Sequence, residues 1–432
     1  MATQPPPHLQ FASAAGNHLY VSAYSRLFDL PAGLAIDAQS AAGAEMIEGL
    51  SRAGPEDESL ALAPQPNPQS VSLNIAASCN LACGYCYAGQ GEFDGRQTAA
   101  MSWDTARATV DRLLDAADPT SPITIGFLGG EPFLNRPLLH RVTAYAARRA
   151  AERELDVRFS VTTNGTLLTD EDRTLLRNHP YAVTVSLDGD AATHDRNRPG
   201  KGGRGSWHRT IAGIVPLLRA PGLAQVAARA TVRRDDMRLR EHLAALAAQG
   251  FTEIGFSPLR ASPRGTDTIA GADWSSYVEA LKEAARGELS RLRMGLPIRL
   301  TNLAVALKQI HRGFASPFPC GAGGGYFSVA SDGAWYACHR AVGDEAYRLG
   351  DNDGLDEAKR GRFLAERHVD AQTDCRSCWA RYLCSGGCHQ EAAARTPQSC
   401  DFVREWLRFC LIAYCELRGN LNPGEGVADA RA

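Results

Sequence analysis

Cys79-Asn-Leu-Ala-Cys83-Gly-Tyr-Cys86 is the stretch of this 432-residue chain from which its fold can be predicted. The three cysteines follow Val71–Ala76, where apolar and polar residues alternate as in a β-strand. Thiolates are soft, strongly donating ligands that suit iron–sulfur clusters. A structural zinc site would need a fourth cysteine or histidine nearby, and the sequence has none there. Three cysteines on one tight loop can therefore hold three irons of a [4Fe–4S] cluster and leave the fourth iron open.

Strand and helix patterns alternate along the chain from this strand onward. Strands are predicted at Val71–Ala76, Ile123–Leu128, Arg158–Thr162, Ala182–Leu187, Gln225–Val232 and Glu253–Ser257. Helices are predicted at Trp103–Ala117, Pro137–Glu152, Asp170–Arg177, Ser206–Leu218, Arg238–Ala248 and Trp274–Arg286. Six βα units in series favour an α/β fold with a parallel sheet. We expect a partial (β/α)6 TIM-type barrel whose site lies at the carboxyl ends of its strands.

The composition excludes several classes of protein. Lys and Arg number 46 against 48 Asp and Glu, so we expect no general attraction to nucleic acid or to an anionic membrane. No apolar run approaches the roughly 18–20 residues of a membrane span. The first residues lack the charged and apolar parts of a secretory signal. We therefore expect a cytoplasmic protein, where clustered cysteines indicate metal sites rather than disulfides.

The other nine of the 12 cysteines lie at the C-terminal end. From Cys320 onward the chain is rich in Gly and Cys and has little strand pattern, which predicts a separate domain folded around metal. Cys410 and Cys415 occur in an apolar helical stretch and are interpreted as core residues. The expected domains are an N-terminal α+β segment with a Pro-rich linker (1–70), the barrel (71–315) and the Cys-rich domain (316–432).

Three further motifs stand at predicted strand ends. They are Gly129-Gly130-Glu131-Pro132, Thr163-Asn164-Gly165-Thr166 and Ser186-Leu187-Asp188-Gly189. Together with CxxxCxxC they give the chain a resemblance to the radical S-adenosylmethionine (SAM) superfamily, from Val71 to about Ser257. The resemblance implies that a cluster on Cys79, Cys83 and Cys86 binds SAM at its open iron. One electron then cleaves SAM to methionine and a 5′-deoxyadenosyl radical.

The resemblance also implies residues that bind SAM. Tyr85 would pack by the adenine, Glu131 would pair with the methionyl ammonium, and Gly129 and Gly130 would let backbone approach the ligand. Residues at the strand ends would reach the ribose, and the candidates are Asn164, Ser186 and Asp188. Arg229 can meet the methionyl carboxylate in a bidentate pair, or it is an ordinary Arg lining the barrel or the surface. The loop His194–Arg198 matches one subgroup of the family without a role that the sequence reveals.

The later cysteines resemble the SPASM domain, an extension of radical SAM enzymes that modify peptides and proteins. The resemblance implies two auxiliary [4Fe–4S] clusters and thus three clusters in all. The outer cluster would be held by Cys375, Cys378, Cys384 and Cys400, and the inner cluster by Cys320, Cys338 and Cys388. Two zinc ions remain a chemical alternative, because CxxC pairs also bind zinc.

Two positions depart from known relatives. Some relatives place another cysteine about six residues after the first, where this chain has Tyr326, so the inner cluster has an open iron or a non-cysteine ligand. Sulfatase-maturing relatives carry an Asp base directly after the second cysteine, where this chain has His339. His339 is the candidate catalytic base, or else a histidine that bonds cluster sulfur or backbone.

The N-terminal segment has two interpretations. Residues 17–50 read as two strands followed by a helix, like a shortened element that recognises a precursor peptide by adding its leader as a strand. The alternative is a cap on the bottom of the barrel.

The sequence as a whole predicts a SAM-cleaving enzyme that takes a hydrogen from a residue of a ribosomally made peptide or protein. The product would be an oxidative crosslink, either thioether or carbon–carbon. Alternatives are a formylglycine-forming sulfatase maturase and a non-enzymatic iron–sulfur electron-transfer protein. Expected partners are the peptide or protein substrate, with or without a leader, and an electron donor such as flavodoxin or ferredoxin. No nucleic acid or membrane partner is expected.

Overall fold

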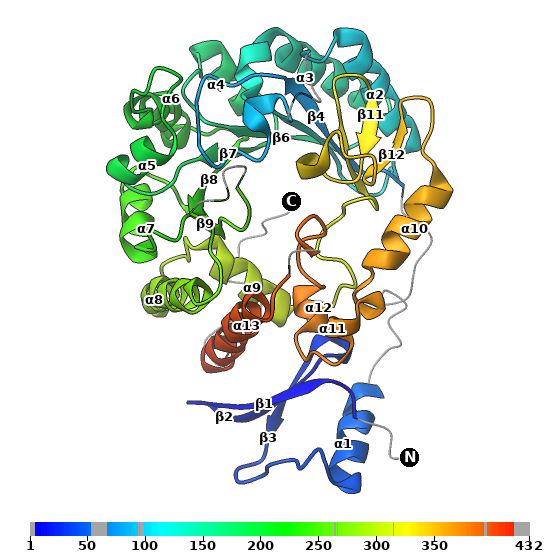
Figure 1. Cartoon of the computed structure of the whole chain (residues 1–432), viewed down its shortest axis with the longest axis vertical. Helices are drawn as coiled ribbons and strands as arrows, with labels where there is room; N and C mark the ends of the chain where they lie inside the picture. The colour runs from blue at the N-terminus through cyan, green and yellow to red at the C-terminus, as the bar shows by residue number, and fades with distance from the viewer. Residues whose placement is uncertain are drawn as a thin grey trace. The chain divides into compact units, whose positions relative to one another are not determined.

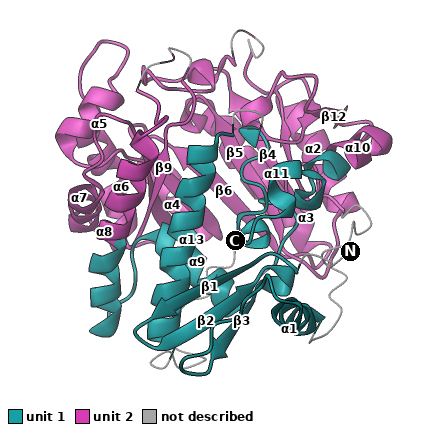
Figure 2. Cartoon of the chain, turned by 60° about the horizontal axis from the view of Figure 1, so that its bottom comes forward, with its two compact units in different colours: residues 1–64, 285–320, 364–432 teal, residues 65–284, 321–363 magenta. Residues whose placement is uncertain are grey.

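The computed structural model of the chain describes residues 5–52, 67–93, 95, 99–262, 265, 267–313, 315–392 and 395–418. They form two compact units, coloured in Figure 2. The first unit comprises 1–64, 285–320 and 364–432, and the second comprises 65–284 and 321–363. Segments from both ends of the chain share the first unit, whereas the predicted domains follow one another along the sequence. The domain boundaries near 70 and 315 stay a prediction, and most of the expected linker lies outside the described residues.

A nine-stranded sheet with the order β12-β11-β10-β4-β5-β6-β7-β8-β9 is the framework of the second unit. Six neighbouring strands are parallel: β4 (Ser70–Ala76), β5 (Ile123–Gly129), β6 (Val157–Thr163), β7 (Tyr181–Ser186), β8 (Gln225–Val232) and β9 (Glu253–Pro258). They are the six predicted strands, with ends that differ by one residue at most. The prediction of an α/β partial barrel is confirmed.

Helices connect these strands as the alternating pattern predicts. Figure 1 shows them along the outer face of the sheet: α2 (Trp103–Ala116), α3 (Arg136–Ala151), α4 (Asp170–Asn178), α6 (Trp207–Arg219) and α7 (Leu239–Ala248). The starts of α2 and α4 are capped by side chains, because Ser102 accepts from the Thr105 amide and Thr169 forms a capping box with Asp172. A short additional helix, α5 (Ala191–Asn197), follows β7. The long helix α8 (Asp273–Arg293) follows β9.

The segment after Cys320 differs from the prediction. It was expected to hold little strand structure, but β10 (Tyr326–Val329), β11 (Ala334–Tyr336) and β12 (Arg348–Asp351) extend the sheet beyond β4. Strand β10 runs parallel to β4, with Tyr326 opposite Ser70, and the next two pairings are antiparallel. Each of these strands has four residues or fewer, too short for a clear alternating pattern. Pairing with β4 and burial of Phe327 and Trp335 stabilise them instead.

The first unit combines an N-terminal sheet with C-terminal helices. Strands β1 (His8–Ser13), β2 (Gly16–Val21) and β3 (Arg26–Leu30) are antiparallel, and α1 (Ala41–Arg52) packs Ile47 on Leu19 and Val21. Helices α9 (Thr301–His311), α11 (Thr373–Arg376), α12 (Arg381–Cys384) and α13 (Pro397–Leu417) belong to the same unit, and α10 (Glu357–Arg367) crosses the boundary between the units. Cys410 and Cys415 are buried in α13, as predicted. Among the described helices, none is long and apolar enough to cross a membrane.

Candidate active site

The cysteine loop, residues 79–86, begins three residues after β4 and offers its sulfur atoms to backbone donors. The Leu81 amide donates to Cys79 Sγ at 3.4 Å, and the Gln90 amide donates to Cys86 Sγ at 3.3 Å. Burial raises the pKa of the Cys83 thiol to about 12 and also raises the pKa of Cys79. Iron bound to these sulfurs would replace their protons. Amide donors aimed at sulfur are what iron–sulfur ligands use, so this loop fits the implied cluster.

The two glycines after β5 hold this loop close to the sheet. Gly129 has a φ of +132°, and a Cβ built on it would lie 2.4 Å from the Ala76 carbonyl oxygen. A Cβ on Gly130 would lie 2.1 Å from the Ser78 carbonyl oxygen. Ala76 ends β4 and Ser78 lies directly before the first cysteine, so glycine is required here for the approach of two backbone segments. A direct approach of these glycines to SAM stays a prediction.

Glu131 is buried, with 1% of its surface exposed, and its carboxylate accepts three hydrogen bonds. Thr163 Oγ1 donates at 2.7 Å, the Asn164 amide at 2.8 Å and the Phe133 amide at 3.3 Å. Burial raises the pKa of Glu131 to about 7 despite these bonds. Oε2 accepts only the Asn164 amide among the described donors and therefore keeps a lone pair for a further donor. The Asn164 side chain donates to Cys79 Sγ at 3.7 Å, which joins Glu131 and the cysteine loop through one residue.

Tyr85 and Asp188, both predicted to contact SAM, bind each other. The Tyr85 hydroxyl donates to Asp188 Oδ2, and the Thr231 amide donates to Asp188 Oδ1 at 2.9 Å. Arg198 completes the group, with Nε 3.0 Å from Asp188 Oδ1 and its guanidinium 5.3 Å from the centre of the Tyr85 ring. The Asp188 carboxylate is therefore already occupied by protein groups. Arg198 is a residue that sequence reasoning missed, because nothing in the loop His194–Arg198 indicated its partner.

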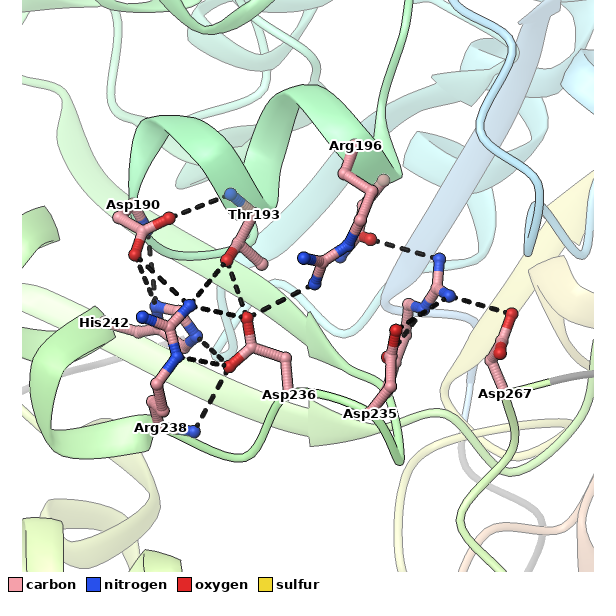
Figure 3. Close-up of polar contacts among 10 residues, drawn as sticks. Asp190, Thr193, Arg196, Asp235, Asp236, Arg238, His242 and Asp267 are labelled. Atoms are coloured by element: carbon pink, nitrogen blue, oxygen red, sulfur yellow. Dashed lines mark hydrogen bonds and ion pairs between the residues drawn. The ribbon is translucent and has the colours of Figure 1, made fainter.

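The α5 segment, Asp190–Gly200, carries Arg198 and is fixed at its start by a buried carboxylate, drawn in Figure 3. Asp236, in the loop after β8, accepts from Thr193 Oγ1 at 2.7 Å and from Arg238 Nε at 2.9 Å. His242 Nε2 lies 3.1 Å from the same carboxylate, while its Nδ1 accepts from the Asp190 amide at 3.4 Å. Burial alone would raise the pKa of Asp236, but the bonds from Arg238 and Thr193 hold it well below its ordinary range.

The other end of the α5 segment contacts the cysteine loop directly. The Ala82 amide donates to the Pro199 carbonyl at 2.7 Å, and Leu81 and Gly200 form an isolated antiparallel bridge. The cysteine loop is thus held between β4 on one side and the α5 segment on the other.

Ser186, at the carboxyl end of β7, and Arg229, inside β8, lie side by side as register partners. The Arg229 side chain is exposed and has no hydrogen bond or ion pair within the described part of the chain. The surrounding protein still desolvates it, which lowers the pKa of Arg229. It is therefore a cation available to an anionic ligand at the predicted end of the barrel.

The two positions that depart from relatives contact each other. Tyr326 Oη lies 3.1 Å from His339 Nδ1, so the partner of His339 is a tyrosine hydroxyl. Burial lowers the pKa of His339 to about 4. The ring of Tyr87, directly after Cys86, lies edge-on to His339 with centroids 6.0 Å apart, and the Arg340 guanidinium lies 5.5 Å from the centre of the Tyr87 ring. The Arg340 amide donates to Cys338 Sγ at 3.4 Å, so this aromatic group connects Cys86 with Cys338 inside the second unit.

The four cysteines predicted for the outer cluster come together in the first unit. Burial raises the pKa of Cys384 to about 11, and Cys375, Cys378 and Cys400 each raise it further by their charge. Arg395 Nη1 donates to Cys375 Sγ at 3.2 Å. This donor set again fits an iron–sulfur cluster. Among the described residues, no three His, Cys, Asp or Glu side chains gather closely enough to chelate a single metal ion.

The three cysteines predicted for the inner cluster are divided between the units. Cys320 and Cys388 belong to the first unit and Cys338 to the second. Their union in one site stays a prediction.

Comparisons with known proteins agree with the resemblance read from the motifs. Residues 73–221 match the family model of the radical SAM superfamily. The serine-type anaerobic sulfatase-maturating enzyme of Klebsiella pneumoniae is 28% identical over 345 residues, which cover 74% of this chain and 81% of that protein. The mycofactocin maturase MftC of Mycobacterium tuberculosis is 26% identical over 334 residues, 74% of this chain and 78% of that protein.

Solved structures show the same fold. The enzyme anSMEcpe with bound AdoMet superposes with a TM-score of 0.70 at 19% identity, covering 82% of this chain and 96% of that one. Streptococcus suis SuiB bound to its precursor peptide SuiA superposes with a TM-score of 0.54 at 14% identity, covering 92% and 98%.

Proposed function

Because the chain carries a radical SAM domain and resembles maturases over 74% of its length, we propose that it oxidatively crosslinks a residue of a ribosomally made peptide or protein. SAM bound at a cluster on Cys79, Cys83 and Cys86 would supply the hydrogen-abstracting radical. The observation that carries the proposal is the cysteine loop itself. Backbone amides point at two of its sulfurs, and one residue, Asn164, joins it to the buried Glu131.

Individual residues would bind and orient SAM. The remaining lone pair of Glu131 Oε2 suits the methionyl ammonium, which would also favour the ionised carboxylate. Arg229 suits the methionyl carboxylate, because it is exposed and unpaired among the described residues, and Ser186 beside it can donate to a ribose oxygen. Asp188 would act through Tyr85, holding that ring in place for the adenine.

The departures at Tyr326 and His339 bear on the product. An Asp base, which formylglycine formation uses in relatives, is replaced by a histidine bonded to Tyr326. The inner cluster would lack a fourth cysteine at the same place. An iron left open there suits a substrate thiolate, because soft anionic sulfur binds iron well. A thioether is therefore the crosslink we favour.

Formylglycine formation is the second candidate, and the 28% identity with a serine-type sulfatase maturase favours it. A peptide carrying a sulfatase-type Ser or Cys motif tests this candidate directly. The crosslink proposal requires that this peptide stay unchanged while a cysteine-containing precursor loses two hydrogens.

The N-terminal sheet is the proposed place for a leader peptide. Within the described residues, β1 and β3 each pair with β2 on one side only, so their outer edges have no strand partner, which an added strand would supply. Streptococcus suis SuiB, which shares the fold, is solved with its precursor peptide SuiA bound.

The test of the enzyme proposal is SAM cleavage. The full chain is reconstituted anaerobically with iron and sulfide and mixed with dithionite and SAM, with flavodoxin or ferredoxin as alternative donors. We expect release of 5′-deoxyadenosine and, with the right peptide, loss of two hydrogens from the peptide by mass spectrometry. Clusters that reduce normally while SAM stays intact would leave the electron-transfer interpretation as the better one. We place this activity in the cytoplasm, where the thiols stay reduced.

A further inference from the structure

The outer cysteine group, Cys375, Cys378, Cys384 and Cys400, is assembled from three helices of one unit. Cys375 lies in α11, Cys384 ends α12 and Cys400 lies in the first turn of α13. The Cys378 amide donates to the Cys375 carbonyl at 3.0 Å, which bends the CxxC stretch into a turn. Two short helices, α11 and α12, and the capped start of the long helix α13 therefore hold the sulfurs, rather than one loop.

Two arginines contact the sulfurs of this group. Arg395 Nη1 lies 3.2 Å from Cys375 Sγ, and its Nη2 donates to the Gln372 side-chain oxygen. Arg404, one turn after Cys400 on α13, interacts electrostatically with Cys378. One of the four sulfurs, Cys375 Sγ, thus accepts a hydrogen bond from a guanidinium, which is the strong, charge-assisted kind, and a second sulfur has a guanidinium nearby.

The charge of Arg395 is not cancelled locally. Its partners are a neutral amide and a cysteine, and it makes no ion pair with a carboxylate among the described residues. Arg404 is partly neutralised, because Asp401 lies 2.5 Å from its Nη2. Asp374 also acts on the group, because its charge raises the pKa of Cys400. Arg395 is therefore the cation at these sulfurs that no carboxylate among the described residues neutralises.

A positive charge and N–H donors at cluster sulfurs stabilise the reduced, more negative state. We infer that Arg395, assisted by Arg404, raises the reduction potential of the iron–sulfur cluster held by these four cysteines. This inference rests on the proposed function, since it takes the cluster as given. A raised potential would give electron transfer among the clusters a direction, because a cluster with a higher potential holds an added electron more readily.

Midpoint potentials test the inference. We first change Cys79, Cys83 and Cys86 to Ala in the full chain, which removes the signal of the SAM-binding cluster. Adding Cys375→Ala to this background then identifies the signal of the outer cysteine group. Arg395→Gln in the same background should lower the equilibrium constant for reduction about tenfold, which is ~59 mV for a one-electron couple. Arg395→Lys keeps the charge but loses the planar fork, so we expect a smaller decrease. EPR-monitored redox titration measures each value.

Arg293→Gln is the matched control, because Arg293 lies in the same unit and pairs with Glu416 instead of a cysteine. Its potential should equal that of the background. A full iron content with an unchanged potential in Arg395→Gln would overturn the inference and leave the cluster assignment standing. If Cys375→Ala does not lower the iron content, the assignment of the cluster is wrong. Should Arg395→Gln lose its iron, Arg395→Lys and Arg404→Gln carry the same test, and an unchanged potential in both rejects the inference.

Discussion

The cysteine loop after β4 and the outer cysteine group use the same ligand in opposite surroundings. The loop brings three thiols together within eight residues, whereas the outer group draws four from α11, α12, α13 and the turn after α11. At the loop, Glu131 acts on Cys79 and Asp188 on Cys83, and the guanidinium that acts on Cys83, Arg198, is paired with Asp188. At the outer group, Arg395 faces sulfur without a carboxylate.

This difference suits two different tasks. Three thiolates beside carboxylates would leave one iron of a cluster free and would place acceptors where a ligand with an ammonium group could bind. Four thiolates with Arg395 beside them would close a cluster to ligands and favour an added electron. The number of cysteines and the sign of the neighbouring charge therefore point the same way at each site.

The sharpest way to break the comparison is to remove each cysteine set in turn. Changing Cys79, Cys83 and Cys86 together to Ala should abolish SAM cleavage but leave about eight irons per chain, as two cubane clusters hold. Changing Cys375 and Cys384 together to Ala should lower the iron content and leave SAM cleavage measurable. Iron analysis and release of 5′-deoxyadenosine check both. Equal loss of SAM cleavage in the two variants would contradict the division of tasks.

Arg198 and Arg395 are expected to differ in how much they contribute to the free energy of unfolding, which is a second, smaller contrast. Arg198→Met leaves the Asp188 carboxylate buried without its cation, so we expect a loss of about 3 kcal/mol in the free energy of unfolding. Arg395→Met leaves only a neutral amide and a thiol unpaired, so its loss should stay below about 1.5 kcal/mol. Denaturant unfolding of the cluster-free chain measures both.

A double variant controls for a general packing effect. Asp188→Asn with Arg198→Met removes both charges and should recover part of the loss, since no uncompensated charge remains. If the double variant loses as much free energy of unfolding as Asp188→Asn and Arg198→Met lose in sum, the ion pair is not the cause of the instability.

Substitutions at the two sites are also expected to differ in their effect on the affinity for SAM. Glu131→Ala removes the proposed partner of the methionyl ammonium, a charge-assisted bond of roughly 1.5–3 kcal/mol. The dissociation constant for SAM should rise about tenfold or more. Arg395→Gln is the matched control at the outer group and should leave SAM affinity as it is. Equilibrium binding with the reconstituted chain decides, and an unchanged constant in Glu131→Ala would mean that SAM binds elsewhere.

Much of the barrel could be predicted because its parallel strands carry recognisable strand patterns, such as alternating apolar residues, and these strands are separated by helical patterns. The strands Val71–Ala76 and Gln225–Val232 could be predicted without knowing which strands pair with them. The strands β10–β12 could not be found in this way, because pairing with β4 stabilises stretches of three or four residues. Strand β1 was missed for a similar reason, since His8–Ser13 has mixed polarity and depends on β2.

The residues of the candidate site also divide into those that the sequence reveals and those that only the fold reveals. The three cysteines of the loop and Glu131 belong to contiguous motifs, which sequence alone can reveal. Arg198 and Arg395 act on partners that only the fold brings near, ten residues away at Asp188 and twenty at Cys375. A cation near a thiolate leaves no spacing signature, so the electrostatic difference between the two cysteine sites became visible only in three dimensions.

The smallest expected effect concerns pH and Glu131. Burial raises the pKa of this carboxyl from its ordinary 4.5 to about 7, so between these values the folded chain holds a proton that the unfolded chain has lost. The free energy of unfolding must then decrease as the pH rises through this window, and the contribution is complete below 4.5 and absent above 7. Glu131→Gln cannot ionise and should remove this slope from the SAM-free chain, whereas Arg395→Gln should keep it. SAM supplies an ammonium that favours the carboxylate, so saturating SAM should flatten the slope in the unchanged chain as well. Thermal unfolding at several pH values between 4.5 and 7.5 measures it, and a slope that persists in Glu131→Gln would assign the titration to another group.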